Sequence, residues 1–215
     1  PRRSRPPSVL VRLLALPRAV FGLIVLIAIV ACAILAPWVV PHDPNEMDFA
    51  ALLAAPNETY WLGTDQLGRD VLSRLIYGSR VALMVSVCAV GLGVAVGVPL
   101  GLISVYFRGW TDDAIMRVMD ALAVFPSIIV AVGLAGAMGP SLMVVIIAIG
   151  GANIPWIARI VRSQGLSVRE QDFVAAAIAG GMSHFRVIAV HIMPHTFAPV
   201  FVQATLGMGY AVLTG

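Results

Sequence analysis

Two histidines four residues apart, His191 and His195, come nearest to a metal-binding pattern in this sequence. On a helix this spacing places both imidazoles on one face, as in zinc proteases. However, no glutamate follows His191, and Pro194 disturbs the helix between the two histidines. We therefore expect no metal site. No serine, histidine and aspartate are grouped as a nucleophile with its base would be, so we expect no catalytic residues.

The basic residues exclude several further kinds of chemistry, because all fourteen are arginines and none is a lysine. A phosphate-binding P-loop, a pyridoxal Schiff base and a Ser-Lys dyad all need a lysine. The chain is therefore expected to be no enzyme, with no nucleotide-hydrolysing site and no cofactor of its own. Its net charge of +3 is modest, and we expect no nucleic acid among its partners.

Composition places the chain in a lipid bilayer. Only 12% of its 215 residues are charged, against about 25% in soluble domains. The mean hydropathy is +0.94, and long uncharged runs alternate with polar segments. These runs predict an all-α, polytopic helical bundle, in which residues 81–215 form a core. The predicted parts are a tail at 1–18, spans at 19–40, 81–107, 121–138, 142–158 and 196–215, an outer loop at 41–80 and an inner loop at 159–195.

The arginines predict which side of the membrane each loop occupies. With five spans, the tail and two of the connections share one side, which holds eleven arginines against three on the other. The positive-inside rule then places the N-terminus and the 159–195 loop in the cytoplasm. An alternative, in which the first apolar run is a lipoprotein signal cleaved before Cys32, is disfavoured because the following residues stay apolar.

The end of the outer loop predicts an amphipathic helix lying at the outer surface. Thr64 is a suitable N-cap, and apolar residues from Leu67 to Ile76 fall on one face. Acid-then-base pairs four residues apart would support this helix. It would serve either as an interfacial brace or as a docking element for an external partner, through Asp65, Arg69, Asp70 and Arg74.

Two features of the apolar spans concern packing and transport. Gly93, Gly97 and Gly101 are each four residues apart, so they predict a strip against which another helix packs closely. Near the middle of a later span, a Gly-Gly pair and a proline loosen the helix around a polar amide. We expect pathway-lining residues here, although a kink with Asn153 bonded to a neighbouring helix is the alternative: Asn153, Pro155 and Trp156.

The cytoplasmic segment predicts a short helix that lies off the membrane. Ser167 and Glu170 fit a capping box, and the alanine-rich run that follows ends at Gly180-Gly181. Phe173 and Val174 are apolar residues with no span to join. A small, smooth helix of this kind suits insertion into a groove on a partner protein, although an ordinary interfacial helix is the alternative.

Residues 172–194 resemble the cytoplasmic loop of bacterial ATP-binding-cassette importer permeases, whose pattern is E-A-A-x3-G-x9-I-x-L-P. The sequence gives Ala175-Ala176-Ala177, then Gly181, then His191-Ile192-Met193-Pro194, so the glycine and proline fall at the family spacing. The glutamate of the pattern is Ala175 here, and its leucine is Met193. Residues 61–74 and 113–120, the latter followed by Phe125-Pro126, are similar to dipeptide, oligopeptide and nickel permeases.

This resemblance implies a permease of the type I importer kind, with six spans in the full subunit, of which five are visible here. It implies a location in a bacterial plasma membrane and a homologous permease as partner there. It also implies two cytoplasmic ATPases that use ATP and Mg, and an external substrate-binding protein. The residues that would couple to an ATPase are Glu170, Asp172, Phe173, Val174, Ala175, Ala176, Ala177, Gly181, Arg186 and Pro194.

The substrate implied by the resemblance is a dipeptide or oligopeptide, with nickel or another small solute as the alternative. A stand-alone proton-coupled carrier or channel would be a different class. Such a protein needs titratable groups buried in its spans, and these spans offer almost none.

Overall fold

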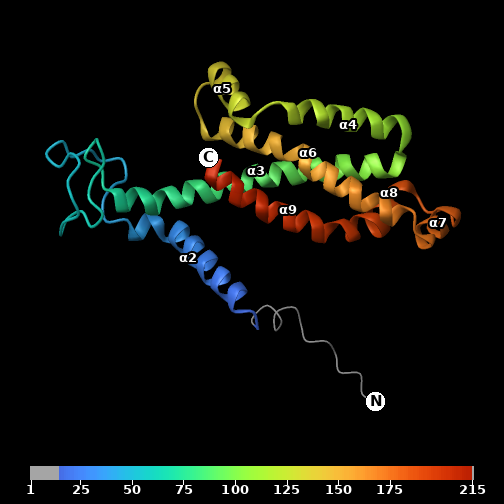
Figure 1. The fold of residues 1–215 in the computed structure, drawn as a ribbon, viewed down its shortest axis with the longest axis horizontal. Coiled ribbons are helices and arrows are strands. Elements are labelled where there is room, and N and C mark those ends of the chain that lie inside the picture. Colours follow the sequence, from blue (N-terminus) through green and yellow to red (C-terminus); the bar gives the residue numbers. More distant parts are fainter. Residues whose placement is uncertain (1–14, 215) are drawn as a thin grey trace, which may run out of the picture. The chain divides into compact units, whose positions relative to one another are not determined.

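A computed structural model describes residues 15–214, and almost all of its regular structure is helical (Figure 1). Within this range the only strand-like pairing is an isolated antiparallel bridge between Thr64 and Asp70. The predicted tail falls mainly on residues 1–14, which lie outside the described residues. The helices are α2 (Pro17–Val39), α3 (Val71–Phe107), α4 (Gly109–Val124), α5 (Ser127–Met138), α6 (Leu142–Arg169), α7 (Asp172–Ala179), α8 (His184–Val187), the π-helix η1 (Ile188–Ile192) and α9 (Met193–Thr214).

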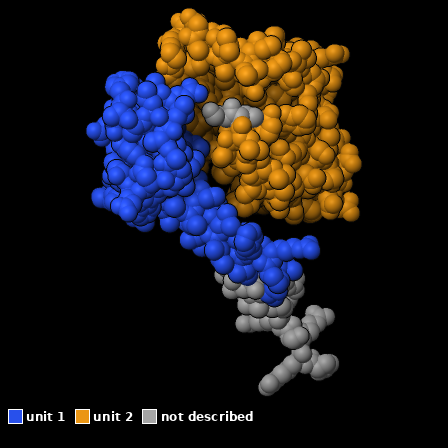
Figure 2. Space-filling model, turned by 60° about the vertical axis from the view of Figure 1, so that its left-hand side comes forward, with its two compact units in different colours: residues 1–83 blue, residues 84–215 orange. Residues whose placement is uncertain are grey.

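Length and composition make several of these helices candidate membrane spans. Four helical stretches are each long and apolar enough to cross a membrane: α2, α3, α6, and the continuous stretch from His184 to Leu213. The bent pair α4 and α5 makes a fifth if it is counted as one span. The prediction of an all-α polytopic membrane protein is therefore confirmed. The chain divides into two compact units, residues 1–83 and 84–215, which Figure 2 colours separately.

The outer loop differs from its prediction at the start of α3. Residues 64–70 form turns and a bridge, so the surface helix predicted from Thr64 is wrong. Asp65 explains the difference, because its carboxylate accepts the backbone N–H groups of Leu67 and Arg69 at 2.8 and 3.0 Å. Such local bonds compete with helix formation. The helix begins only at Val71, and it then continues without a break through the predicted 81–107 span.

The predicted span 121–138 is not one continuous helix, because α4 and α5 meet there at an angle of 82°. Pro126 is the N-cap of α5, and a proline keeps the residue before it out of the α-helical region. At 1.5 Å per residue, the twelve residues of α5 reach about 18 Å, which is short of a bilayer core of about 30 Å. The pair is therefore a bent element in which α4 supplies most of the length.

The following helix is longer than predicted. Ser141 caps α6 by accepting the N–H of Val144, and the helix runs to Arg169 rather than to residue 158. The predicted capping box is wrong, because Ser167 lies inside α6 and Glu170 is its C-cap. The short helix α7 begins at Asp172 and ends before Gly180, where the glycine pair was predicted to end it.

Pro194, which was expected to disturb the helix between the two histidines, does not interrupt it, because it lies in the first turn of α9. The π-helix η1 immediately precedes it, and a proline lacks the N–H that a helix interior would require. The chain thus stays helical from His184 to the end of α9, so most of the predicted 159–195 loop is helical.

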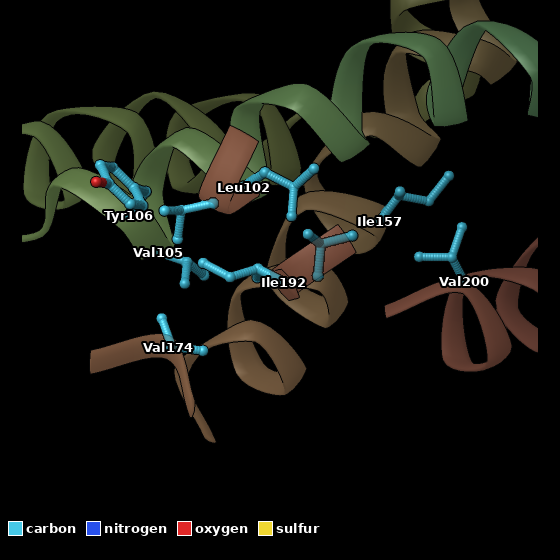
Figure 3. Close-up of a cluster of buried hydrophobic side chains, with 9 residues drawn as sticks. Leu102, Val105, Tyr106, Ile157, Val174, Ile192 and Val200 are labelled. Atoms are coloured by element: carbon cyan, nitrogen blue, oxygen red, sulfur yellow. The ribbon is translucent and has the colours of Figure 1, made fainter. Parts of the chain in front are cut away.

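Close packing between α3 and α6 forms the centre of the second unit. A Cβ added to Gly93, Gly97 or Gly101 would lie 2.7 to 2.9 Å from the nearest atom of α6, so the glycine strip is a helix contact as predicted. A cluster of buried side chains continues this contact toward α7 (Figure 3). It contains Leu102, Val105, Tyr106, Ile157, Val161, Val174, Val187, Ile192 and Val200.

Candidate functional site

The short helix α7 is anchored to the cluster by one side chain. Val174 is fully buried, whereas its neighbours on α7 are mostly exposed (Figure 3). The exposed members of the predicted coupling set are Glu170, Asp172, Phe173, Ala175, Ala176, Gly181, Arg186 and Pro194, and Ala177 is half-buried. This arrangement anchors α7 to the buried cluster through Val174 and leaves most of its other side chains exposed.

Polar contacts join the ends of α3 and α6 to the segment that follows α7. Arg108 forms an ion pair with Glu170 at 3.0 Å. The hydroxyl of Tyr106 is hydrogen-bonded to Nδ1 of His184, and the guanidinium of Arg169 lies 5.6 Å from the centre of the Tyr106 ring. Glu170 is therefore the C-cap of α6, and its ion pair with Arg108 stabilises the chain just before α7.

The histidines that suggested a metal pattern lie against an aromatic ring. The centroids of His191 and His195 are each 5.9 Å from that of Phe173. Among the described residues, no group of three or more histidines, cysteines and carboxylates is arranged to hold a metal ion. The two histidines thus support one edge of α7.

A groove lies among α4, α5, α6 and α9. Its volume is about 610 Å³, and it is lined by Leu122, Ala123, Phe125, Ser127, Ile149, Ala152, Asn153, Trp156, Gln203, Leu206, Gly207 and Tyr210. The lining is largely apolar, and its polar groups are uncharged. A pocket of this composition can accommodate a small polar solute without binding it through a fixed charge.

Two of the three residues predicted to line a pathway reach this groove. Asn153 and Trp156 are part of its lining, whereas Pro155 is almost completely buried and does not line it. A helix places residues 153 and 156 on one face and turns residue 155 away from it. The Asn153 amide donates to the Ile149 carbonyl of its own helix at 2.9 Å, rather than to a neighbouring helix.

Two ion pairs between α4 and α6 were not predicted from the sequence. Two guanidinium nitrogens of Arg162 each donate to a carboxylate oxygen of Asp112 at 2.6 Å. The Ser104 hydroxyl donates to the same carboxylate. Asp120 pairs with Arg159 at 2.7 Å. The signal in the sequence is that Asp112 and Asp120 precede the uncharged stretch 121–158, and that Arg159 and Arg162 follow it.

The outer loop is held together by a second carboxylate network. Asp65 pairs with Arg69 at 2.8 Å, as predicted, but the predicted Asp70–Arg74 pair is wrong because Arg74 also binds Asp65. Burial acts to raise the pKa of Asp65. The N–H groups of Arg69 and Leu67 outweigh that effect and lower the pKa below its usual value.

Asp70 caps α3 from a nearly closed site. Its carboxylate accepts the N–H groups of Leu72 and Ser73 at 3.3 and 3.1 Å, and the imidazole of His42 lies 3.4 Å away. Burial acts to raise the pKa of Asp70. The hydrogen bonds from Ser73, His42 and Leu72 dominate and lower it. Asp70 is therefore charged in the folded loop at neutral pH.

Replacing Asp70 with alanine is expected to loosen the start of α3, because a lost N-cap costs about 1–2 kcal/mol. Hydrogen exchange at the Leu72 and Ser73 amides should quicken about tenfold. Since folding lowers the pKa of Asp70, its contribution is complete above the ordinary pKa of about 4 and is lost as pH falls through the folded value. Glu58→Ala, at an exposed position of the same loop, is the control. Equal exchange in both variants would contradict the capping role.

Taken together, several long apolar helices, a groove among four of the helices and an uncovered short helix describe a multi-spanning membrane protein. The family described as binding-protein-dependent transport system inner membrane component matches residues 93–214. The N-terminal transmembrane domain of oligopeptide transport permease C matches residues 8–56. The chain belongs to the family of binding-protein-dependent transport system inner membrane components.

Curated relatives agree with this assignment. The chain is 41% identical to a dipeptide transport system permease protein of Alkalihalophilus pseudofirmus, over 91% of this chain and 64% of the relative. It is 35% identical to the corresponding protein of Haemophilus influenzae, over 91% and 68%. A glutathione transport system permease protein of Pectobacterium atrosepticum is 33% identical, over 90% and 64%. The chain thus spans about two thirds of the length of these relatives.

Proposed function

We propose that this chain is a permease subunit of an ATP-driven importer for dipeptides or oligopeptides. Family membership supports the transport role, and the relatives named for dipeptide transport support the substrate class. The arginine distribution supports an orientation with the N-terminus in the cytoplasm, and family membership supports a location in a bacterial plasma membrane. The chain carries out no ATP hydrolysis itself, and ATP with Mg is bound by partner subunits.

The observation that carries the proposal is the mounting of α7. Val174 fixes the helix to the core, and the Arg108–Glu170 pair supports its base. Phe173 and Ile178 remain exposed on a helix of eight residues. An apolar helix face that is rigidly supported but uncovered suits a groove on another protein. That protein is an ATPase subunit, and α7 is the coupling helix.

A second, homologous permease completes the pathway, and an external binding protein delivers the substrate. Helix α5 buries none of its residues, so it has free apolar surface for a second subunit or for lipid. Two ATPases close together when they bind ATP, and each moves one coupling helix. Through α6 and α9 this motion changes which side of the membrane the groove faces.

Replacing Gly181 with valine is expected to uncouple ATP hydrolysis from uptake while the complex still assembles. The backbone of Gly181 has a φ of +75°, which β-branched residues strongly disfavour, although the space around it is open. The end of α7 must therefore shift. In proteoliposomes holding the complete importer, peptide uptake per ATP hydrolysed should fall about tenfold.

Gly181→Asn is the matched control, because asparagine adopts positive φ far more readily than valine. It should retain most of the uptake per ATP. Normal coupling in the valine variant would contradict the assignment of α7, and failure of the unmodified importer to take up any peptide with ATP would contradict the transport function itself.

A further inference from the structure

Two arginines meet a single acid where α3 and α6 end. Arg108 directly follows the last residue of α3, and Arg169 is the last residue of α6. Arg108 pairs with Glu170 at 3.0 Å, and its positive charge repels that of Arg169. Within residues 15–214, Arg169 forms no ion pair of its own, so the two arginines share the charge of Glu170. One positive charge is therefore left without a counter-ion here.

Neither guanidinium has all of its hydrogen bonds. The Nε atoms of Arg108 and Arg169 are buried without an acceptor. The guanidinium of Arg169 lies over the Tyr106 ring, which offers a π face but no carboxylate. Asp112, on which Arg108 also acts, is already bound through both oxygens by another arginine. A partly buried cation that lacks its hydrogen bonds is costly, so this place favours an added anion.

Exposed aromatic side chains mark the depth at which these arginines lie. Phe107 and Trp110 flank Arg108 along the chain, and they are 55% and 85% exposed. Such rings gather at membrane–water interfaces, at the level of the lipid headgroups. Helices α3 and α6 are both candidate spans, and both end here. Arg169 is half-buried and the Arg108 side chain is 40% exposed, so a headgroup can approach both.

We propose that Arg108 and Arg169 bind the headgroup phosphate of an anionic phospholipid in the inner leaflet. A guanidinium matches a phosphate through two parallel N–H···O bonds. The cytoplasmic leaflet carries anionic lipids, which basic groups at the ends of spans attract. The bound lipid holds the ends of α3 and α6 together just before α7. This inference rests on the orientation proposed above, and it is independent of which solute is transported.

Lipid binding by the complete importer tests the site. The purified complex in detergent is titrated with dioleoylphosphatidylglycerol or with the zwitterionic dioleoylphosphatidylcholine, and native mass spectrometry measures the bound lipid. The unmodified complex should prefer phosphatidylglycerol. Arg169→Gln should weaken its affinity for this lipid about fivefold, which corresponds to about 1 kcal/mol for one charge at the membrane surface. Arg169→Lys should lose less, because it keeps the charge and loses only the planar fork.

Glu170→Gln is expected to change the affinity in the opposite direction. Removing the carboxylate frees Arg108 from its ion pair, so phosphatidylglycerol should bind about threefold more tightly, as expected for an exposed pair. A purely structural role of Glu170 would not strengthen lipid binding. Arg117→Gln is the matched control, because Arg117 is an exposed arginine of α4, and its affinity should stay unchanged. Gel filtration checks the assembly of each variant.

Several outcomes would overturn the proposal. Equal affinity of Arg169→Gln and the unmodified complex would remove the site, and so would an equal loss in Arg117→Gln. Displacement of phosphatidylglycerol by excess inorganic phosphate at constant ionic strength would make free phosphate, rather than a lipid, the ligand. If Arg169→Gln binds lipid normally but releases the ATPase subunits, the two arginines contact a protein instead of the membrane.

Discussion

Replacement of Gly101 by leucine is expected to destabilise the second unit by about 3 kcal/mol or more, because it overfills a tight helix contact. A Cβ at this position would lie 2.7 Å from both the Ala158 carbonyl oxygen and the Val161 Cβ. The nearest obstacle is backbone, so no side-chain rotation can relieve it. Helix α3 must separate from α6, and the buried cluster next to Leu102 must open. Unfolding of the purified chain by SDS in mixed micelles measures the loss.

Gly91 provides the matched control on the same helix. A Cβ added there would meet no atom within 4 Å, and the position is exposed. Gly91→Leu should therefore change the free energy of unfolding by less than about 0.5 kcal/mol. Equal destabilisation by the two leucines would show that the loss comes from changing any glycine of α3, rather than from its contact with α6.

The glycine strip illustrates what the sequence could predict. Three glycines four residues apart define one helix face whatever that face contacts, so the close approach follows from spacing alone. Apolar runs likewise predict spans, because the bilayer sets their minimum length. Spacing does not name the contacting helix, however. The groove depends on which side chains of α4, α6 and α9 are left uncovered, and only the folded chain determines that.

Local competition explains where the predicted helices were wrong. Asp65 fits the first turn of a helix, yet its carboxylate instead closes a turn around Gly68, whose φ is +75°. Pro126 is compatible with an uncharged run, but it directs the chain through a sharp bend. In both cases one residue is compatible with two structures, and a constraint within a few residues of it excludes the continuous helix.

The α4–α6 ion pairs show the same limit for charges. Arg117 has acidic residues three and four positions away on its own helix, which is the spacing of a helical ion pair. The structure instead pairs Asp112 and Asp120 with arginines 50 and 39 residues away. Charged groups at membrane depth generally pair with one another, so their partners depend on helix packing rather than on sequence distance.

Removal of the Asp112 carboxylate is expected to cost about 1–3 kcal/mol, because it leaves the half-buried Arg162 guanidinium without its partner. Asp112→Ala should therefore unfold at a lower SDS fraction and reduce assembly with the other importer subunits. The neighbouring Asp113 is exposed and forms no ion pair among the described residues, so Asp113→Ala should behave as the unmodified chain.

A double variant separates the two contributions to this loss. Asp112→Ala with Arg162→Met removes both charges, and the methionine keeps much of the arginine's apolar stem in place. If the cost lies in the unpaired charge, the double variant is more stable than Asp112→Ala alone, because an apolar pair avoids the desolvation penalty. If the double variant is instead as unstable as the sum of the two single changes, the pair acts through the bidentate geometry that binds α6 to α4 and to Ser104 of α3.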